Sequence, residues 1–403
     1  MSKIAVMGYG TVGSGVVEVL DMNKDLIASN AGEEVEVKYI LDLREFPGDP
    51  FEDKIVHDVD LIMEDPEVSV VVETMGGTGA AYTFVKRALE NGKSVCTSNK
   101  NLIAAFGSEL LAIAREKNVR LLFEAAVGGG IPIIRSVNEA LTADKIDCVT
   151  GILNGTCNYI LTKMAREGAE FEAALKEAQE NGFAEADPAS DIEGHDSCRK
   201  IAIMASLISG KNVDFENIHT EGIDKITAED FKYADSLGMK IKLFSECIYE
   251  DGKLKAITAP FIIDRDHPLY GIDGVINAVC VHGNAVGDLV FQGAGAGKLP
   301  TASAVTADIV DAVKNKEASH KLLWDATQLK PEDAKKYSYR YFIRLNEADK
   351  EKAADIFKDC EFVKAAGVDS EIGAFTSEMT QEEFETAASS LELISFIRLS
   401  DTK

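Results

Sequence analysis

An acid and a lysine four residues apart, Asp196 and Lys200, are the side chains of this sequence best placed for proton transfer. Residues four apart share a helix face, so the carboxylate can keep the ammonium charged and aimed, as a general acid requires. An ordinary ion pair on a helix surface has the same spacing and stabilises a helix by about 0.2–0.5 kcal/mol. The pair alone does not distinguish these two interpretations, so the surrounding sequence must.

The segment in front of this pair is acidic. Residues 181–200 contain five carboxylates, at Glu185, Asp187, Asp191, Glu193 and Asp196. Ser190 and Glu193 have the spacing of a capping box, which predicts that the helix begins at Ser190. Apolar residues recur on one face of that helix as far as Gly210, which is expected to end it. Glu185 precedes the helix and could fold back over its first turn.

The composition restricts the class of protein. A chain of 403 residues suggests two or three domains, and 46% apolar with 27% charged residues is typical of a soluble globular protein. No apolar run approaches the ~20 residues that span a membrane, and the N-terminus enters a strand pattern without a secretory signal. The net charge of −26 argues against nucleic acid and anionic membranes as partners. Seven cysteines without a Cys-x-x-Cys pair indicate reduced thiols and a cytoplasmic location.

The first residues have the pattern of a dinucleotide-binding turn. Residues 3–7 are an apolar run expected of a buried parallel strand, GYGTVG follows at 8–13, and apolar residues then recur at helical spacing. The first glycine makes the turn, the second lets a pyrophosphate approach the backbone, and the third lets helix and strand pack. The residues expected to contact NAD or NADP here are Gly8, Gly10, Thr11, Val12 and Gly13.

Two charged residues follow the next expected strand, at 35–41. Asp42 comes 29 residues after the last glycine of the turn, where about 20 is usual, so the first helix or its loop is expected to be extended. Asp42 could bind the ribose hydroxyls of NAD, whereas Arg44 could meet the 2′-phosphate of NADP. The sequence leaves this choice open, and one of the two could simply begin a solvated loop.

Strands and helices alternate through the first part of the chain. Expected strands at 69–73, 94–97 and 120–124 are separated by helical patterns, which predicts an α/β, Rossmann-type doubly wound parallel sheet. The residues at the ends of these strands include Gly76, Lys100 and Glu124. Ligands bind at the carboxyl ends of such strands, so these residues are candidates for a binding site.

A glycine-rich elbow at residues 125–132 ends the alternation and predicts a domain boundary. The expected domains are a dinucleotide-binding domain at 1–127 with a return segment at about 295–325, an α+β domain with a mixed sheet at 128–294, and a C-terminal domain at 338–403. In the second domain, residues 151–161 predict a strand, a polar turn and a helix. A second glycine loop at 293–297 opens a further helix and could approach a ligand closely.

The C-terminal residues 338–403 are expected to form a separate domain. Their pattern gives strand, helix, two short strands, helix and strand, which is the βαββαβ order of a ferredoxin-like fold. A lone four-stranded sheet exposes its edge strands, so this domain is expected to pair with a partner chain.

In this order, the motifs resemble those of homoserine dehydrogenase over roughly residues 1–325. The segments that carry the resemblance are GYGTVGSG (8–15), TSNK (97–100), FEAAVGGGIP (123–132), GILNGTCNYI (151–160), the acidic stretch ending at Lys200, and GAGAGKLPTAS (293–303). The resemblance implies an oxidoreductase that interconverts L-homoserine and L-aspartate 4-semialdehyde with NAD or NADP, on the pathway to threonine, methionine and isoleucine. It also implies a homodimer or homotetramer, with the dimer formed mainly through the sheet of the second domain.

The resemblance further implies roles for individual residues. Lys200 would donate the proton to the aldehyde oxygen with Asp196 beside it, and Lys100 would lie between nicotinamide and substrate. Glu185 would hold the amino group of homoserine. Other residues would line the substrate pocket (Thr156, Asp191), approach the cofactor (Gly297), or match the family's site for a monovalent cation, Na⁺ or K⁺ (Glu124 with the carbonyls of Val127, Gly129 and Ile131). A cationic substrate suits an acidic pocket, and hydride delivery needs a placed proton donor, so these roles agree with the residue chemistry.

The C-terminal domain resembles the regulatory ACT domain of longer members in its order of elements but departs from it in sequence. The Asp-x-Pro-Gly turn that usually follows the first strand is missing, and the segment from residue 347 reads EADKEK. Inhibition by threonine is therefore expected to be weak or absent, and the domain is expected to serve in assembly.

Two other functions fit parts of the sequence. A semialdehyde dehydrogenase acting through a thioester needs an activated cysteine at a strand end, for which Cys96 and Cys157 are the candidates. A nicotinamide-dependent amino-acid sensor would bind ligands through the C-terminal domain without turnover. The sensor leaves the pairing of Asp196 with Lys200 unexplained.

Overall fold

The computed structural model describes residues 1–316 and 323–400, so residues 317–322 of the expected return segment and residues 401–403 lie outside the described part of the chain. The chain divides into two compact units. The first comprises Met1–Lys145, Ala202–Phe215 and Phe291–Leu329. The second comprises Ile146–Ile201, Glu216–Val290 and Lys330–Lys403.

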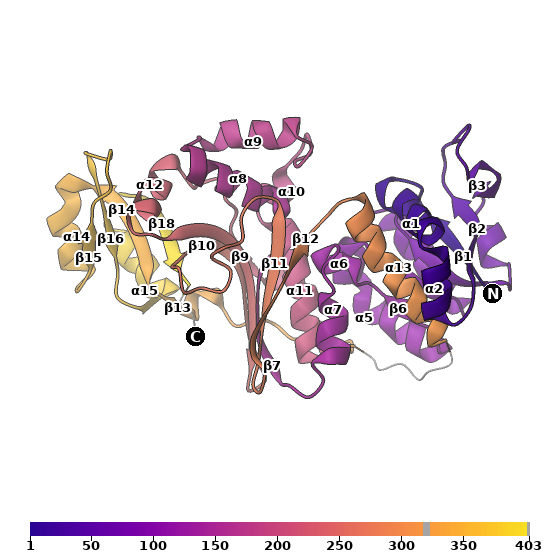
Figure 1. Ribbon diagram of the computed structural model, residues 1–403. Coiled ribbons are helices and arrows are strands. Elements are labelled where there is room, and N and C mark those ends of the chain that lie inside the picture. Colours follow the sequence, from indigo (N-terminus) through magenta and orange to yellow (C-terminus); the bar gives the residue numbers. More distant parts are fainter. Residues whose placement is uncertain (317–322, 401–403) are drawn as a thin grey trace. The chain divides into compact units, whose positions relative to one another are not determined.

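The first unit is built on a sheet of parallel strands in the order β3-β2-β1-β4-β5-β6 (Figure 1). The strands are β1 (Ser2–Met7), β2 (Val35–Leu41), β3 (Ile55–Val56), β4 (Val68–Glu73), β5 (Ser94–Thr97) and β6 (Leu121–Leu122). The central strands β1 and β4 are apolar and buried along almost their whole length, because helices cover both faces. This order confirms the predicted doubly wound, Rossmann-type sheet.

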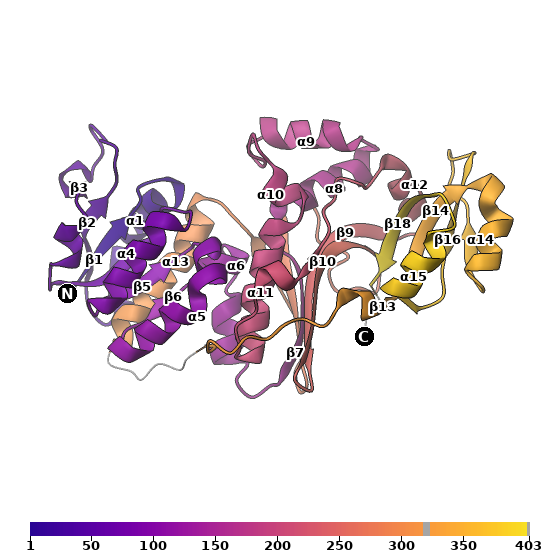
Figure 2. The same ribbon diagram turned by 180° about the vertical axis from the view of Figure 1, so that it is seen from behind.

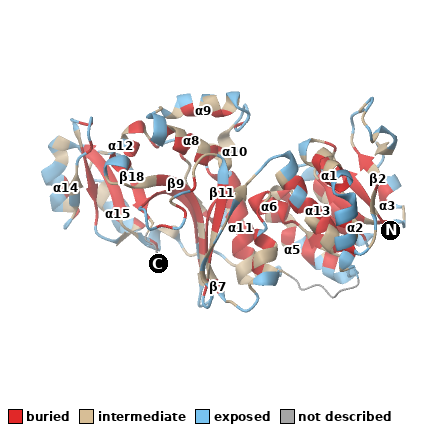
Figure 3. Ribbon diagram, in the orientation of Figure 1, coloured by how far each residue is buried: buried red, intermediate tan, exposed pale blue. Residues whose placement is uncertain are grey.

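Helices lie on both faces of this sheet (Figures 1 and 2). One face carries α1 (Thr11–Met22), α2 (Lys24–Ala31) and α13 (Lys298–Lys314), and the other carries α4 (Gly79–Glu90) and α5 (Lys100–Lys117). Shorter helices are α3 (Asp60–Met63), α6 (Ala125–Gly128) and α7 (Ile133–Arg135). The sides of the long helices that face the sheet are buried, and their outer sides are exposed (Figure 3). Because α2 follows α1 directly, the segment before Asp42 is long, as predicted.

The larger sheet has ten strands and lies mostly in the second unit. Its first strands are β7 (Ile146–Ile152), β8 (His219–Thr220), β9 (Lys240–Glu250), β10 (Lys253–Ile263), β11 (Ile276–Gly283) and β12 (Gly287–Ala294). The helices beside them are α8 (Gly155–Glu167), α9 (Phe171–Glu180), α10 (Ala189–Ile192), α11 (His195–Ser209) and α12 (Ala228–Ser236). Antiparallel β9 and parallel β8 both pair with β10, which confirms the predicted mixed sheet. No described helix combines the length and hydropathy needed to span a bilayer.

The helix that carries Asp196 begins later than predicted. α10 is a single turn, and Gly194 then adopts a φ of 83° before α11 starts at His195. The predicted start at Ser190 is therefore wrong, because a helix does not continue through a residue in the left-handed conformation. The end agrees with the prediction, since α11 stops at Ser209 and Gly210 follows with a φ of 68°.

The C-terminal residues have the predicted βαββαβ order. The elements are β13 (Ser338–Tyr339), β14 (Tyr341–Asn346), α14 (Lys350–Ile356), β15 (Glu361–Val363), β16 (Glu371–Phe375), β17 (Met379–Thr380), α15 (Gln381–Ala388) and β18 (Leu393–Leu399). The four main strands lie in the order β18-β14-β16-β15 with antiparallel neighbours, which is a ferredoxin-like arrangement.

This C-terminal sheet does not stand alone. β18 pairs in parallel with β10, with Arg398 opposite Phe261 and Leu399 opposite Ile262. The expectation of a lone sheet with two exposed edges is therefore wrong, because one of its edge strands already has a partner within the chain. A buried ion pair reinforces the junction, since Arg344, 1% exposed, donates to Asp230 of α12 at 2.7 Å.

Candidate active site

The glycine turn after β1 has the geometry that the sequence predicts. Gly8 has a φ of 95°, and a Cβ on Gly13 would lie 1.8 Å from the Gly8 carbonyl oxygen. A side chain at Gly13 would therefore force α1 away from the turn. A Cβ on Gly10, the N-cap of α1, would meet no atom within 4 Å, so the helix N-terminus beginning with Thr11 and Val12 is open to a phosphate group.

The second glycine loop reaches the same helix. Gly297, with a φ of 121°, is the N-cap of α13. A Cβ on Gly15 of α1 would lie 2.8 Å from the Lys298 carbonyl oxygen, so the first turn of α13 packs closely against α1. Gly297 therefore lies near the start of the helix that follows the glycine turn, as a cofactor contact requires.

Asp42 and Arg44, considered above as alternative contacts for the ribose, form a single ion pair. Arg44 donates to Asp42 Oδ1 from Nε and to Oδ2 from Nη2, both at 2.9 Å. Asp42 Oδ2 also accepts from the Tyr9 backbone N at 2.8 Å, so the pair is attached to the glycine turn. The hydrogen bonds from Arg44 hold the pKa of Asp42 well below its usual range, against the effect of partial burial. Because the Arg44 side chain is 61% exposed and that of Asp42 only 10%, the guanidinium is the outer charge of the pair.

Glu73 connects the carboxyl ends of β4 and β5. Its carboxylate is fully buried, accepts from the backbone N of Met75 at 2.8 Å and of Gly76 at 3.2 Å, and accepts from the Thr97 hydroxyl at 2.6 Å. Burial raises the pKa of Glu73, and these donors oppose the shift. The carboxylate thereby sets the turn that presents Gly76.

Asn99 places Lys100 at the same edge of the sheet. The Asn99 side chain accepts from Leu102 N at 3.1 Å, which caps α5, and donates to the Gly77 carbonyl at 2.6 Å. Lys100 is the first residue of α5 and is half-buried. The predicted residues Gly76 and Lys100 therefore lie after the adjacent strands β4 and β5, Gly76 in a loop and Lys100 at the start of α5.

Asp196 and Lys200 face one another on α11, as predicted. Lys200 Nζ lies 2.7 Å from Asp196 Oδ2 and donates to the Leu153 carbonyl at 2.6 Å. The lysine and aspartate side chains are only 10% and 6% exposed. An ammonium has three hydrogens, and these contacts account for two of them. The result is an oriented, largely desolvated donor rather than a mobile surface charge.

Asn154 joins this pair to its surroundings. Its Nδ2 donates to Asp196 Oδ2 at 3.1 Å and to Asp191 Oδ1 at 2.8 Å, and its Oδ1 caps α8 by accepting from Cys157 N at 2.8 Å. One buried amide therefore sets the positions of two carboxylates relative to the start of α8. The polar turn predicted between strand and helix is confirmed by this N-cap.

The Thr156 side chain holds the backbone of the segment that carries Glu185. The Thr156 hydroxyl donates to the Phe183 carbonyl at 2.6 Å and is 9% exposed. Glu185 lies two residues further along, in an exposed segment between α9 and α10. Thr156 thus anchors the segment that carries Glu185 to the first turn of α8.

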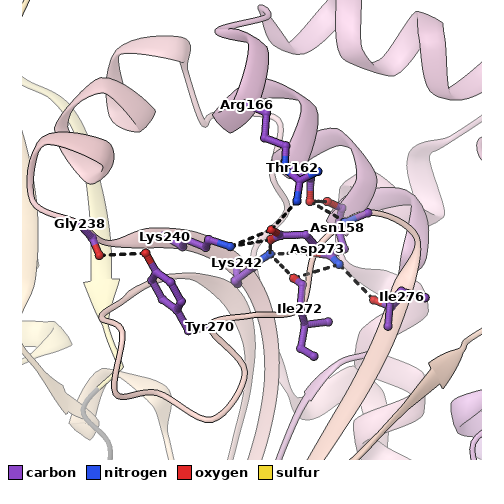
Figure 4. Close-up of polar contacts among 11 residues, drawn as sticks. Asn158, Thr162, Arg166, Gly238, Lys240, Lys242, Tyr270, Ile272, Asp273 and Ile276 are labelled. Atoms are coloured by element: carbon purple, nitrogen blue, oxygen red, sulfur yellow. Dashed lines mark hydrogen bonds and ion pairs between the residues drawn. The ribbon is translucent and has the colours of Figure 1, made fainter.

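A cluster of charged residues contacts α8 at Asn158, one turn after its N-cap residue Asn154 (Figure 4). Lys242, 2% exposed, donates to Asn158 Oδ1 at 3.0 Å, to Asp273 Oδ1 at 2.9 Å and to a backbone carbonyl. Asp273 also pairs with Lys240 at 2.8 Å and with Arg166 at 2.9 Å. Each hydrogen of the Lys242 ammonium has an acceptor, so this buried lysine supports α8 and is not available for proton transfer.

The residues that would match the family's site for a monovalent cation, Glu124, Val127, Gly129 and Ile131, lie between β6 and α7. Glu124 is 3% exposed, and its two oxygens accept from two backbone N–H groups of α7, each at 2.8 Å. Burial raises the pKa of Glu124, so a neighbouring cation would favour its charged form. Val127, Gly129 and Ile131 would add carbonyl oxygens, which are ligands that suit a hard cation. Among the described residues, no group of three or more His, Cys, Asp or Glu side chains is arranged to hold a metal ion.

The cysteines considered for thioester chemistry are inaccessible. Cys96 and Cys157 are both 0% exposed, and burial raises the pKa of each thiol well above its usual value. Cys157 Sγ donates to the Asp191 carbonyl at 3.1 Å. A buried thiol in this state is a poor nucleophile, which argues against that mechanism.

Comparisons with known proteins give matches both to the region of the glycine turn and to the region of Asp196 and Lys200. A family model described as homoserine dehydrogenase matches residues 132–310, and one described as homoserine dehydrogenase, NAD binding domain, matches residues 8–124. A homoserine dehydrogenase of Pseudomonas aeruginosa is 44% identical over 313 residues, covering 77% of this chain and 72% of the relative. The chain belongs to the homoserine dehydrogenase family. It is accordingly an oxidoreductase that acts on a CH–OH group with NAD(P), as the sequence predicts.

Solved structures of homoserine dehydrogenases share the fold. That from Thiobacillus denitrificans is 34% identical, has a TM-score of 0.90, and the match covers 99% of this chain and 98% of the other. A hyperthermophilic archaeal homoserine dehydrogenase in complex with NADPH is 27% identical, with a TM-score of 0.64 over 77% of this chain and 97% of the other. The thioester enzyme and the sensor are not favoured by these matches.

Three residues that position the candidate site were missed or undervalued in the sequence. Asn154 was predicted only as part of the polar turn within residues 151–161, although its amide contacts both Asp191 and Asp196. Glu73 and Asn99 were not identified. A carboxylate ending an otherwise apolar strand, as Glu73 does, is a signal that could have been followed, because a buried charge needs partners.

Proposed function

We propose that the chain catalyses the reversible oxidation of L-homoserine to L-aspartate 4-semialdehyde with NAD or NADP, in the biosynthesis of threonine, methionine and isoleucine. The observation that carries this proposal is the oriented ammonium of Lys200, fixed by Asp196 at 2.7 Å and by the Leu153 carbonyl at 2.6 Å. The bound nicotinamide would supply or accept the hydride. The protein must then place the substrate and manage one proton.

Lys200 acts in this proposal as the proton donor to the aldehyde oxygen and, in reverse, accepts the hydroxyl proton. Asp196 and Leu153 hold two of its ammonium hydrogens, and the third would be donated to the substrate oxygen. Asn154 prevents Asp196 from turning away, because its amide donates to the same carboxylate oxygen at 3.1 Å. Leu153 contributes only its carbonyl.

The substrate ammonium is held, in this proposal, by Asp191 and Glu185, with Thr156 lining the pocket. Asp191 has a fixed position through Asn154, whereas Glu185 lies in an exposed segment tied down at Phe183. Glu185 would therefore move onto the substrate when it binds, whereas the Asp191 carboxylate would already be in position to accept from the substrate ammonium. Two carboxylates suit a ligand that carries one ammonium.

The cofactor is bound, in this proposal, by the glycine turn (Gly8, Gly10, Thr11, Val12, Gly13), by Gly76 and Gly297, and by Asp42 and Arg44 at the ribose. Lys100, the first residue of α5, would lie between nicotinamide and substrate. Because Arg44 already neutralises Asp42, both NAD and NADP should be accepted. Glu124 with the carbonyls of Val127, Gly129 and Ile131 would hold Na⁺ or K⁺ as a structural ion.

We assign the cofactor to residues 1–127 and about 295–325, and the substrate and the main dimer contact to residues 128–294. Residues 338–403 form the ACT-like part. We further propose that the chain forms a homodimer or homotetramer in the cytoplasm, with small molecules as its other partners. Threonine is expected to inhibit weakly or not at all, because the Pro-Gly turn of the regulatory domain is missing.

One spectrophotometric assay tests the reaction. Nicotinamide absorbance is followed with homoserine and oxidised cofactor, with the semialdehyde and reduced cofactor, and with cofactor alone. The proposal expects turnover in both directions and none without substrate. Cofactor binding without homoserine-dependent turnover would refute it and would revive the sensor.

A further inference from the structure

The last strand of the C-terminal sheet carries a buried arginine whose main partner belongs to a distant loop. Arg398 on β18 is 1% exposed and donates to both carboxylate oxygens of Glu221, each at 2.7 Å. A third bond goes to the Gln381 side chain at 3.1 Å. Such a two-pronged bond fixes orientation as well as distance, and burial makes the loss of either partner costly.

Glu221 is itself firmly held. It lies between β8 and α12, its backbone N donates to the Thr258 carbonyl of β10 at 2.7 Å, and its side chain contacts His219 at 2.6 Å. Burial alone would raise the pKa of Glu221, but the bonds from His219 and Arg398 lower it to about 2. The carboxylate is thus charged at neutral pH, and the loop cannot move without disturbing Arg398.

The same loop packs on the turn that precedes α11, backbone against backbone. Ile223 N donates to the Ile192 carbonyl at 2.8 Å. A Cβ on Gly222 would lie 2.1 Å from that carbonyl oxygen and 2.6 Å from Glu193 Cα. On the other side, a Cβ on Gly194 would approach the Glu221 carbonyl oxygen to 3.1 Å. No flexible side chain separates the loop from the turn, so a displacement of one displaces the other.

This turn connects the two acids of the substrate region. Asp191, which accepts from Asn154, directly precedes Ile192. Asp196, which pairs with Lys200, comes two residues after Gly194. Asp196 and Lys200 belong to the same helix and move together, whereas Asp191 lies on the far side of the turn. A shift of the turn therefore changes the position of Asp191 relative to Lys200.

We propose that Arg398 and Glu221 are positioning residues for substrate binding, acting through Gly222 on the turn at residues 192–194 and so on Asp191. This inference rests on the proposed function, because it uses Asp191 as a contact for the substrate ammonium. It gives the C-terminal sheet a role in the active site within its own chain, in addition to any role in assembly.

The test compares two ways of disturbing this linkage in the full-length chain. Arg398→Met removes the charge that binds Glu221. Gly222→Ala removes no contact, but its methyl group would displace the turn at residues 192–194. Gly271→Ala is the matched control, because Gly271 lies in the same unit, has no positive φ, and a Cβ there would meet no atom within 4 Å. For each variant, kcat, the KM for homoserine and the KM for the nicotinamide cofactor are measured, together with the thermal midpoint.

Both variants should raise the KM for homoserine by roughly tenfold or more, with kcat and the cofactor KM within about twofold of the parent. Gly271→Ala should match the parent throughout. A merely structural role would lower the thermal midpoint but leave the homoserine KM of the folded enzyme unchanged, and that result would overturn the proposal.

Conservative variants guard against loss of folding. Arg398→Lys keeps the charge but not the two-pronged geometry, and Glu221→Asp keeps the carboxylate but shortens its reach. Either should raise the homoserine KM by a few-fold, and an unchanged KM in both would refute the linkage. Failure of the proposed function is distinguishable, because the parent would then not oxidise homoserine at all, whereas failure of this inference leaves an active parent beside unaffected variants.

Discussion

Asp196–Lys200 and Asp42–Arg44 are both acid–cation pairs between near neighbours in the sequence, but their surroundings differ. The lysine and aspartate on α11 are 10% and 6% exposed, and a distant backbone carbonyl and a distant amide contact the pair. In the other pair the guanidinium is 61% exposed, and the contacts are to the adjoining glycine turn. In each pair, the short spacing in the sequence brings the acid close to the cation. The two pairs differ in how far the cation is buried, and so in the chemistry for which it is suited.

A pair shielded from water interacts more strongly with its ligand and is less sensitive to salt than an exposed pair. Lys200 is therefore suited to proton transfer, where a small displacement changes the rate. Arg44 is suited to influencing the choice between two similar cofactors, which requires only a small free-energy difference.

Lys200→Ala should reduce kcat by roughly 10²–10⁴-fold while cofactor binding stays intact, because the proton donor is lost at the chemical step. Steady-state kinetics with fluorescence titration of the reduced cofactor provides both readouts. Lys176→Ala is the control, since Lys176 on α9 is 77% exposed and its nitrogen lies as far as 3.9 Å from the Glu180 carboxylate. A variant that keeps most of its kcat would transfer the role to Lys100.

Asp196→Asn should reduce kcat by roughly tenfold to a hundredfold, less than the loss of the lysine, because Leu153 still contacts the ammonium. The comparison of the two variants at saturating homoserine measures how much of the donor's effect depends on its acid. A loss as large as that of Lys200→Ala would show that acid and lysine act as one unit. An unchanged kcat would show that Asp196 does not contribute to the chemical step.

At the cofactor end, Asp42→Ala should shift the ratio of kcat/KM values toward NADP, and Arg44→Gln should shift it toward NAD. Each shift is expected to be roughly three- to fivefold, because an exposed pair contributes little. Kinetics with both cofactors at low and at high salt checks the sign and should show the shifts shrinking as salt rises. Shifts in the same direction for both variants would show that the pair does not face the ribose.

The ion pair between Asp42 and the exposed Arg44 also predicts a small effect of pH on stability. The folded-state pKa of Asp42 is depressed below its ordinary 3.8, so its stabilising contribution is present above that value and is lost as the pH falls below it. Asp42→Asn should therefore lower the thermal midpoint at pH 7 but have a smaller effect near pH 3. The exposed Asp21→Asn is the comparison. A difference that is independent of pH would indicate lost packing rather than lost charge.

The features that the sequence predicted well are those that depend on neighbouring residues. The glycine turn, the alternation that builds the parallel sheet, and the contact between Asp196 and Lys200 follow from local spacing. The same reasoning placed the start of α11 wrongly, because the capping-box spacing at Ser190 gave no hint that Gly194 would turn the chain.

The features that it missed join segments far apart in the chain. Asn154 meets Asp191 and Asp196, and Arg398 meets Glu221, through contacts that no spacing rule relates. The pairing of β18 with β10 was missed for the same reason, since a strand pattern does not say which edge it will join. The sequence shows which residues carry a charge, but only the fold shows which residues they contact.

The contact between β10 and β18 also has a consequence for the order in which the molecule matures. During synthesis, the glycine turn and its parallel sheet emerge first, and β9 and β10 can form their hairpin long before β18 exists. Until then Glu221 lacks its arginine, and the loop that packs on the turn before α11 lacks the support of β18. A newly made chain should therefore become able to bind nucleotide earlier than it becomes able to hold homoserine.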